Sequence, residues 1–376
     1  MPGPRIAIFA GPSGGHLFPA LAYAESLKDR WPQSERFLVT SRRAENFVRH
    51  FEPGLFTGVE YLREFPFPSG FSLRSVQFLL EFPRAFMDSA KFLSKTKPDL
   101  CAGFGSFVSY PGMRLAAWKK IPNFIHEQNV VPGKATRMLA KHAGLVALSF
   151  ENTFQGVSLK RVETTGLPVR RLLRDAAEKK PLQKSGPFKI LVVGGSQGAH
   201  GLNRIIFDTF LRLSSEEKKI IAVTHITGQT DSDWVRQGYR ENGIQAEVHA
   251  FYGKMQELYS EADMAITRAG ANTLFELAVF KVPAIVVPYP FAGAHQADNA
   301  VYFEKRQALI QQAEVSLTPE WLLSRIRDLQ KNMDQRKTLS LNISRLAPLH
   351  ASEKLADWTE KLLGETPSGS HRQPFN

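Results

Sequence analysis

The feature that most constrains the fold is a unit that occurs twice: an apolar run, a glycine-rich turn and a helical pattern. IAIFAGPSGGHLFPALAYAESL (6–27) opens the first half, and ILVVGGSQGAHGLNRIIF (190–207) opens the second. Apolar runs without strict polar alternation, separated by helical patterns, are typical of parallel sheets buried on both faces. The sequence therefore predicts an α/β protein with two doubly wound, Rossmann-like domains and a cleft between them.

The strand-like runs number seven in the first half and six in the second. They are RIAIFAG, RFLVTS, VEYLREF, DLCAGF, NFIHEQ, LVALSF and RVETTG, then KILVVGG, IIAVTHITG, AEVHAFY, MAITR, PAIVVPY and ALIQQ. A charged, proline-containing segment separates the halves and indicates a linker. We predict these parts: a first domain, a linker, a second domain, a C-terminal helix and a disordered tail, at 1–168, 169–188, 189–345, 346–365 and 366–376.

The charge balance indicates an anionic partner. The chain of 376 residues holds 48 Lys and Arg against 36 Asp and Glu, a net charge of +12. It lacks zinc-ligand spacing and aromatic RNA-binding motifs, which argues against nucleic acid and favours a membrane surface or a phosphorylated substrate. No apolar run approaches the ~20 residues that span a bilayer. A single cysteine, Cys101, fits a reducing compartment, so we predict a cytoplasmic protein.

The two glycine turns predict a diphosphate site. In open α/β sheets, ligands bind beyond the carboxyl ends of the strands, where helix N-termini offer free N–H groups. GPSGGH and GGSQGAH both follow such a strand. Neither fits the Walker pattern, and neither fits GxGxxG with an acidic ribose partner. Two such loops predict a nucleotide diphosphate as the ligand.

Further motifs carry a resemblance to a known family. HEQNVVPG (126–133), GLPVR (166–170), TRAGANTLFEL (267–277) and VPYPFAGAHQADNA (287–300) join GPSGGHLFPALA and GGSQGA. In this order, over residues 5 to 360, they resemble the MurG family, GT-B N-acetylglucosaminyltransferases of peptidoglycan synthesis. The resemblance implies transfer of GlcNAc from UDP-GlcNAc to the MurNAc-pentapeptide of lipid I, linked to undecaprenyl pyrophosphate, which gives lipid II. It also implies a peripheral protein on the cytoplasmic face of the inner membrane.

The resemblance assigns roles to residues. Ser13, Gly14 and Gly15 lie on the diphosphate and acceptor side, and Asn129 contacts sugar or acceptor. Arg170 reaches toward the donor, Ser196 holds phosphate, and the backbone of Tyr252 meets uracil. Glu276 binds the ribose hydroxyls and Gln296 the GlcNAc hydroxyls. The donor loop and helix start comprise Ala271, Asn272, Thr273, Leu274, Phe275 and Glu276. His295 replaces the first of a usual Gln–Gln pair, which bears on sugar selectivity.

Each of these residues also has an ordinary interpretation. Glu276 by itself reads as a surface carboxylate within a helix, Arg170 as part of the basic linker, and HEQN as a strand end with internally paired polar groups. His295 and Gln296 read as ordinary loop residues. Convergence on one cleft favours the functional interpretation.

The chemistry needs a base and a way to stabilise the leaving diphosphate. We predict no cofactor and no metal, because backbone amides and helix dipoles place positive potential at the developing charge. DSD (231–233) reads as a helix cap rather than a metal motif. His16, which precedes a helix predicted from near Phe18, is the preferred base, because a helix N-terminus favours neutral imidazole. Its rivals are Glu127 and His126, and its ordinary role is to cap its own loop or bind phosphate.

A candidate membrane segment follows the third predicted strand. In FPFPSGFSLRSVQFLLEFPRAFMDSAKFLSKTK, a helical projection places Phe78, Leu79, Phe82, Phe86, Ala90 and Leu93 on one stripe. Periodicity alone favours a helix packed on its sheet. The family resemblance implies docking on anionic lipid, with Phe67, Phe71 and Leu73 as insertion candidates.

Three rival functions remain open at this level. One is another GT-B transferase with a lipid acceptor, and the second is a UDP-sugar epimerase, which needs no acceptor. The third is a dinucleotide-dependent oxidoreductase or a non-catalytic nucleotide-binding protein. That reading expects an acidic residue after the second strand, where Ser41, Arg42 and Arg43 stand. Arginine there suits a 2′-phosphate, but the second glycine loop opposes this reading.

Overall fold

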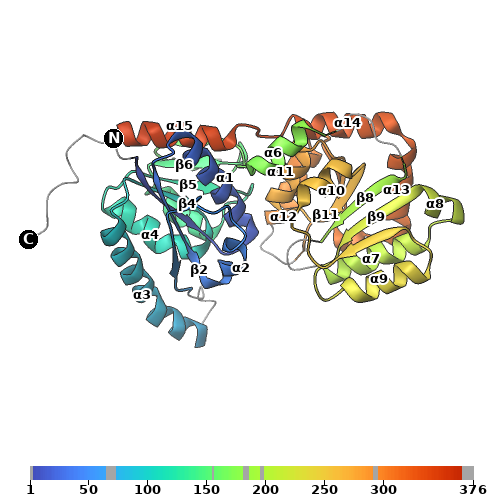
Figure 1. Ribbon diagram of the computed structural model, residues 1–376, viewed down its shortest axis with the longest axis horizontal. Helices are drawn as coiled ribbons and strands as arrows, with labels where there is room; N and C mark the ends of the chain where they lie inside the picture. Colours follow the sequence, from blue (N-terminus) through green and yellow to red (C-terminus); the bar gives the residue numbers. More distant parts are fainter. Residues whose placement is uncertain are drawn as a thin grey trace, which may run out of the picture. The chain divides into compact units, whose positions relative to one another are not determined.

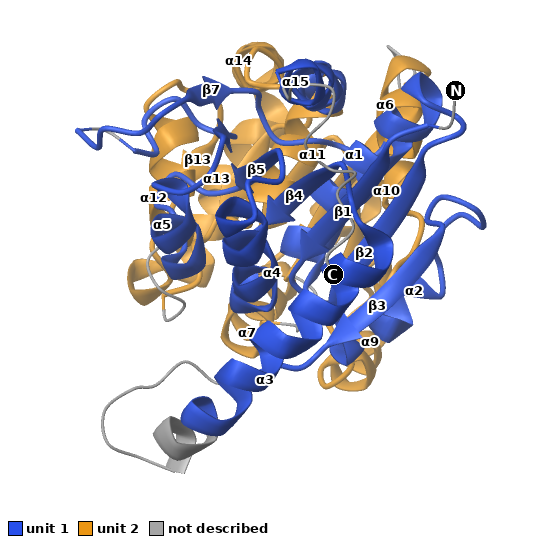
Figure 2. Cartoon of the chain, turned by 90° about the vertical axis from the view of Figure 1, so that its left-hand side faces the viewer, with its two compact units in different colours: residues 1–170, 350–376 blue, residues 171–349 orange. Residues whose placement is uncertain are grey.

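The computed structural model describes residues 3–64, 73–154, 156–180, 186–194, 199–290 and 295–365, with backbone only at 73–77. Ser196, Phe67, Phe71, the side chain of Leu73 and the predicted tail at 366–376 lie outside this part. The chain divides into unit 1, residues 1–170 and 350–376, and unit 2, residues 171–349 (Figure 2).

Unit 1 contains a seven-stranded parallel sheet in the order β3-β2-β1-β4-β5-β6-β7. Its strands are β1 (Arg5–Ala10), β2 (Glu35–Ser41), β3 (Gly58–Leu62), β4 (Leu100–Phe104), β5 (Asn123–Glu127), β6 (Leu145–Leu148) and β7 (Val162–Thr164). Its helices are α1 (Gly14–Arg30), α2 (Glu45–Val48), α3 (Leu73–Thr96), α4 (Ser106–Trp118), α5 (Lys134–Ala140) and α15 (Ala351–Gly364).

Alternate residues of β1 enter two different cores. Ile6 and Ile8 pack with α1 and α15, whereas Ala7 and Phe9 pack with α3, α4 and α5. Both faces of the strand are therefore buried, which explains why its sequence lacks polar alternation.

Helix α15 belongs to unit 1 although it lies near the end of the chain. It runs beside α1 (Figure 1), where the hydroxyls of Tyr23 and Thr359 lie 2.5 Å apart. Arg30 of α1 forms ion pairs with Asp357 and Glu360 of α15.

Unit 2 repeats the architecture with a six-stranded parallel sheet in the order β10-β9-β8-β11-β12-β13. Its strands are β8 (Phe188–Val193), β9 (Ile221–Ile226), β10 (Ala246–His249), β11 (Met264–Thr267), β12 (Ala284–Val286) and β13 (Ile310–Gln311). Its helices are α6 (Arg171–Glu178), α7 (His200–Leu211), α8 (Ser215–Ile220), α9 (Ser232–Glu241), α10 (Met255–Glu261), α11 (Ala271–Val279), α12 (His295–Glu304), α13 (Pro319–Lys331) and α14 (Met333–Ser344).

In both sheets the strand order runs outward in two directions from an inner pair, β1 and β4 in unit 1 and β8 and β11 in unit 2, as in a doubly wound sheet. All thirteen predicted strands form, and the prediction of two Rossmann-like domains with parallel sheets is confirmed. The glycine loop after β1 therefore lies at the carboxyl edge of its sheet, and Gly194, directly after β8, lies at the corresponding edge of the other sheet.

Candidate active site

His16 lies in the first turn of α1. The helix begins at Gly14, four residues before the predicted start, because Ser13 is the N-cap and its carbonyl accepts from the N–H of His16 and Leu17 at 3.0 Å. The sequence pattern does not predict this start, because the helix begins with Gly14 and Gly15 and glycine has a low helix propensity. Ser13 Oγ lies 3.0 Å from His16 Nδ1.

The His16 ring lies in a slot between two glycines. A Cβ atom on Gly11 would stand 2.8 Å from Nδ1, and one on Gly105 would stand 2.8 Å from Cδ2. Burial of the ring in this slot lowers its pKa from 6.5 to about 4. His16 is therefore neutral near pH 7, as a general base must be.

The far wall of this slot is the turn between β4 and α4, which the sequence analysis does not identify. Gly105 and Ser106 both have positive φ, +80° and +69°. Gln128 Nε2 donates to Phe104 O at 3.1 Å and so joins the end of β5 to the same turn. The signal available in the sequence is a glycine directly after a buried strand, as in GPSGGH.

The Glu127 side chain of the HEQN motif forms hydrogen bonds within its own loop. The buried Glu127 carboxylate accepts from the Asn129 N–H at 3.0 Å, its Nδ2 at 3.2 Å and the Gly133 N–H at 3.0 Å. His126 is fully buried, and its Nε2 lies 3.0 Å from Gly166 O. Burial lowers the pKa of His126 to about 4. The side chain of His126 is therefore enclosed, and the carboxylate of Glu127 holds the 129–133 turn.

Arg170 ends unit 1 beside α1. Its guanidinium carbon lies 4.2 Å from the centre of the Phe18 ring, and the residue is half-buried. Its cation is thus held against the second turn of the helix that carries His16.

In unit 2, the first turn of α7 carries a histidine oriented by a buried carboxylate. Asp231 accepts from the side chains of His200 at 2.7 Å, Asn203 at 2.7 Å and Trp234 at 2.9 Å. Burial raises the pKa of Asp231, but these hydrogen bonds together hold it below its usual value. Asp231 is the N-cap residue of α9, yet its carboxylate makes no cap hydrogen bond. DSD thus opens a helix with Asp231 as its N-cap residue, as predicted, while the carboxylate bonds to tertiary partners instead of to the N–H groups of the helix.

Glu276 is a buried group rather than a surface carboxylate. It is 7% exposed, near the middle of α11, and Oε2 accepts from the Tyr259 hydroxyl at 2.9 Å. The helix starts at Ala271 after the N-cap Gly270, so Ala271 to Phe275 supply its first turns. Ala271, Leu274 and Phe275 are buried, whereas Asn272 and Thr273 are half-buried.

Gln296 joins two loops at the carboxyl edge of the unit 2 sheet. Its Oε1 accepts from the N–H of Ala269, after β11, at 3.1 Å and from that of Tyr289, after β12, at 3.0 Å. Tyr252 lies after β10, and its hydroxyl donates to Glu257 Oε2 at 2.9 Å. That hydrogen bond raises the pKa of Tyr252.

Comparison with known proteins places this chain in a family. Residues 6–148 match the N-terminal domain of glycosyltransferase family 28, and residues 189–355 match its C-terminal domain. The chain is 36% identical over 364 residues to a protein of Desulfotalea psychrophila, covering 96% of this chain and 97% of that one. That relative is named UDP-N-acetylglucosamine–N-acetylmuramyl-(pentapeptide) pyrophosphoryl-undecaprenol N-acetylglucosamine transferase. The chain belongs to glycosyltransferase family 28.

Other relatives agree with family 28 membership. A Myxococcus xanthus protein of the same name is 34% identical, covering 99% of this chain and 97% of that one. The crystal structure of Acinetobacter baumannii MurG is 27% identical, with a TM-score of 0.73 over 95% of this chain and 99% of that one. The crystal structure of the kitacinnamycin glycosyltransferase is 17% identical, with a TM-score of 0.70. The match covers 96% of this chain and 99% of that one, and it shows a shared fold. The predictions of a glycosyltransferase and of its fold class are confirmed.

Proposed function

We propose that this family 28 enzyme transfers GlcNAc from UDP-GlcNAc to the 4-hydroxyl of MurNAc-pentapeptide on undecaprenyl pyrophosphate, converting lipid I into lipid II. Relatives with this named activity match nearly the full chain. The observation that carries the chemistry is the neutral His16, held between Gly11 and Gly105 at the end of β1.

His16 is the proposed base for the acceptor hydroxyl. When Nδ1–H donates to Ser13 Oγ, Nε2 keeps its lone pair and can take the proton. The acceptor oxygen then attacks C1 of GlcNAc with inversion, and the C1–O bond to UDP breaks with its electron pair going to the diphosphate. Gly14, Gly15, Asn129 and the Glu127 loop would hold the acceptor side of this reaction.

The donor contacts are proposed for unit 2. Glu276 would accept from the ribose hydroxyls, and the Gln296 amide nitrogen would donate to a GlcNAc hydroxyl, because its Oε1 is held by two backbone N–H groups. The Tyr252 backbone would meet uracil, while Ser196 and Arg170 would meet the diphosphate. Amides at the start of α11 and in the glycine loop would replace a metal ion. Transfer is thus expected to persist in EDTA; loss in EDTA with recovery on Mn²⁺ would contradict this.

A transfer assay with radiolabelled UDP-GlcNAc and a lipid I analogue tests the proposal. The wild type is expected to give labelled lipid II, and His16→Ala should lower kcat about 10²–10⁴-fold with little change in UDP affinity. His142→Ala, a change at an exposed histidine of the same unit, is the matched control. Conversion of UDP-GlcNAc without any lipid acceptor would instead indicate an epimerase. If His16→Ala weakens UDP binding while kcat survives, the base lies elsewhere.

We also propose that the protein docks on the anionic cytoplasmic face of the inner membrane through α3. Within the described residues, no helix is both long and apolar enough to cross a bilayer. The predicted apolar stripe on α3 has a packed part and an exposed part. Phe82 and Phe86 pack against Tyr110 of α4, whereas Leu79 is 70% exposed. Leu80 and Met87 are also exposed, and the exposed Arg84 lies between them in the sequence.

Vesicle sedimentation tests the docking. A few basic residues worth about 1 kcal/mol each, with one apolar patch, suffice for salt-sensitive binding to anionic vesicles. Leu79→Ser with Leu80→Ser should reduce binding, and Val315→Ser, at an exposed apolar residue of unit 2, should not. Equal partitioning of the wild type to neutral and anionic vesicles would argue against docking by this route.

A further inference from the structure

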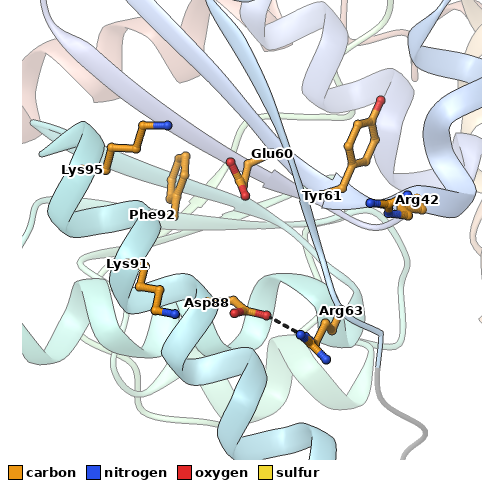
Figure 3. Close-up of a pocket in the computed structure, with 8 residues that line it drawn as sticks. All are labelled: Arg42, Glu60, Tyr61, Arg63, Asp88, Lys91, Phe92 and Lys95. Carbon is orange, nitrogen blue, oxygen red and sulfur yellow. Dashed lines mark hydrogen bonds and ion pairs between the residues drawn. The ribbon is translucent and has the colours of Figure 1, made fainter.

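A cavity lies in unit 1, between the edge strand β3 and the second half of α3. It has a volume of about 510 Å³ and is open to solvent. Figure 3 shows its lining: Glu60, Tyr61 and Arg63 at β3, Arg42 after β2, and Asp88, Lys91, Phe92 and Lys95 on α3. We call this cavity the α3–β3 groove.

Positive charge predominates in the α3–β3 groove. Arg63 is neutralised by Asp88, with Nε 3.0 Å from Oδ2. Among the described residues, Arg42, Lys91 and Lys95 make no ion pair, and neither does Glu60 on the opposite wall. Three cations and one carboxylate therefore remain for a ligand.

This mixture of charges fits a peptide better than a phospholipid headgroup. An anionic headgroup presents phosphate to cations and gains nothing from a carboxylate such as Glu60. A peptide with more carboxylates than amines matches both signs, because its carboxylates meet the lysines and an amine meets Glu60.

The α3–β3 groove also lies within reach of the proposed reaction centre. Arg42 and Arg63 directly follow β2 and β3, and the His16 loop follows β1, all at one edge of the sheet. With neighbouring strands about 4.8 Å apart, the ends of β3 and β1 are separated by about 10 Å. An extended pentapeptide spans up to about 17 Å. A peptide attached to a sugar beside His16 can therefore enter the groove at its Arg63 end, where Asp88 pairs with Arg63. From Asp88, α3 carries Lys91 about 5 Å and Lys95 about 10 Å further along the groove.

We propose that the α3–β3 groove binds the peptide stem of the acceptor through its carboxylates, with Lys91 and Lys95 as the main cations. This inference rests on the proposed function, which supplies an acceptor that carries a pentapeptide. The groove then sets acceptor affinity and takes no part in the chemical step, because Lys91 and Lys95 lie on α3 beside the edge strand β3, whereas the His16 loop follows β1.

Acceptor kinetics with and without the stem test the α3–β3 groove. For Lys91→Gln with Lys95→Gln, the KM of a pentapeptide acceptor should rise about three- to tenfold, the scale of two exposed ion pairs. The kcat, the KM for UDP-GlcNAc and the KM of an acceptor lacking the peptide should stay unchanged. Lys91→Arg with Lys95→Arg should restore the pentapeptide KM, and Lys119→Gln with Lys160→Gln is the control of equal charge change.

The possible outcomes distinguish a failure of the groove inference from a failure of the proposed function. If the wild type transfers to both acceptors and the variant shows no peptide-dependent change in KM, the groove inference alone falls. An equal loss with both acceptors, together with loss of binding to anionic vesicles, would assign the lysines to lipid and overturn the inference. Absence of transfer by the wild type to either acceptor would overturn the proposed function itself.

Discussion

Gly105→Ala tests whether the slot around His16 matters for catalysis. Gly105 has φ +80° and ψ −174°, a backbone region open essentially only to glycine. A side chain there costs about 1–3 kcal/mol in backbone strain. The new Cβ would also stand 2.8 Å from His16 Cδ2 and 3.0 Å from Nε2, so the imidazole must move. Overpacking of this kind adds about 1–3 kcal/mol.

We therefore expect Gly105→Ala to lower the free energy of unfolding by about 2–6 kcal/mol, the sum of these two costs. Displacing a catalytic base by about 1 Å should lower kcat about 10²-fold. Gly54→Ala is the matched control, because Gly54 has φ +77° and a Cβ atom added there would meet no atom within 4 Å. It should lose about 1–2 kcal/mol of stability from the left-handed backbone and retain kcat.

Urea denaturation and the lipid transfer assay measure the two effects separately. A double variant, His16→Ala with Gly105→Ala, removes the ring that the new Cβ meets. Its kcat should equal that of His16→Ala alone. Its loss in free energy of unfolding should be smaller than the sum of the losses of the two single variants. A Gly105→Ala enzyme with the kcat of Gly54→Ala would refute the argument that this turn positions His16.

Three further predictions follow from buried groups. Burial lowers the pKa of His126 to about 4 and of His225 to about 3, whereas the unfolded chain titrates near 6.5. Urea unfolding should therefore show full stability above about pH 6.5 and a loss as pH falls toward 4, and His225→Gln should flatten this slope. Glu276→Ala should mainly raise the KM for UDP-GlcNAc, since ribose contacts are alike in ground and transition states, while Tyr259→Phe should do so less; unchanged donor kinetics in both would contradict the donor placement. Asp231→Asn should lower the free energy of unfolding by about 1–3 kcal/mol, because hydrogen bonds from three side chains lose their charged acceptor, and His200→Ala should cost less since that side chain is largely exposed.

The order of the strands in both units follows from local patterns in the sequence. Runs such as IAIF and ILVV are apolar without alternation because both faces of a central parallel strand are buried, so all thirteen strands were predictable. The glycine loops located the carboxyl edges, and motif resemblance identified the family. Those signals are local, and each is contained within about ten residues.

The burial and the partners of individual polar groups depend on tertiary packing. His16 and His126 look alike in the sequence, yet His16 lies in a glycine slot at the sheet edge and His126 is enclosed beneath Gly166. Glu276 reads as a surface carboxylate until Tyr259, 17 residues away, is seen to donate to it in the interior. Lys91 and Glu60 belong to one groove because α3 packs on β3. Burial and partners come from segments distant in the chain, so no local pattern of residues encodes them.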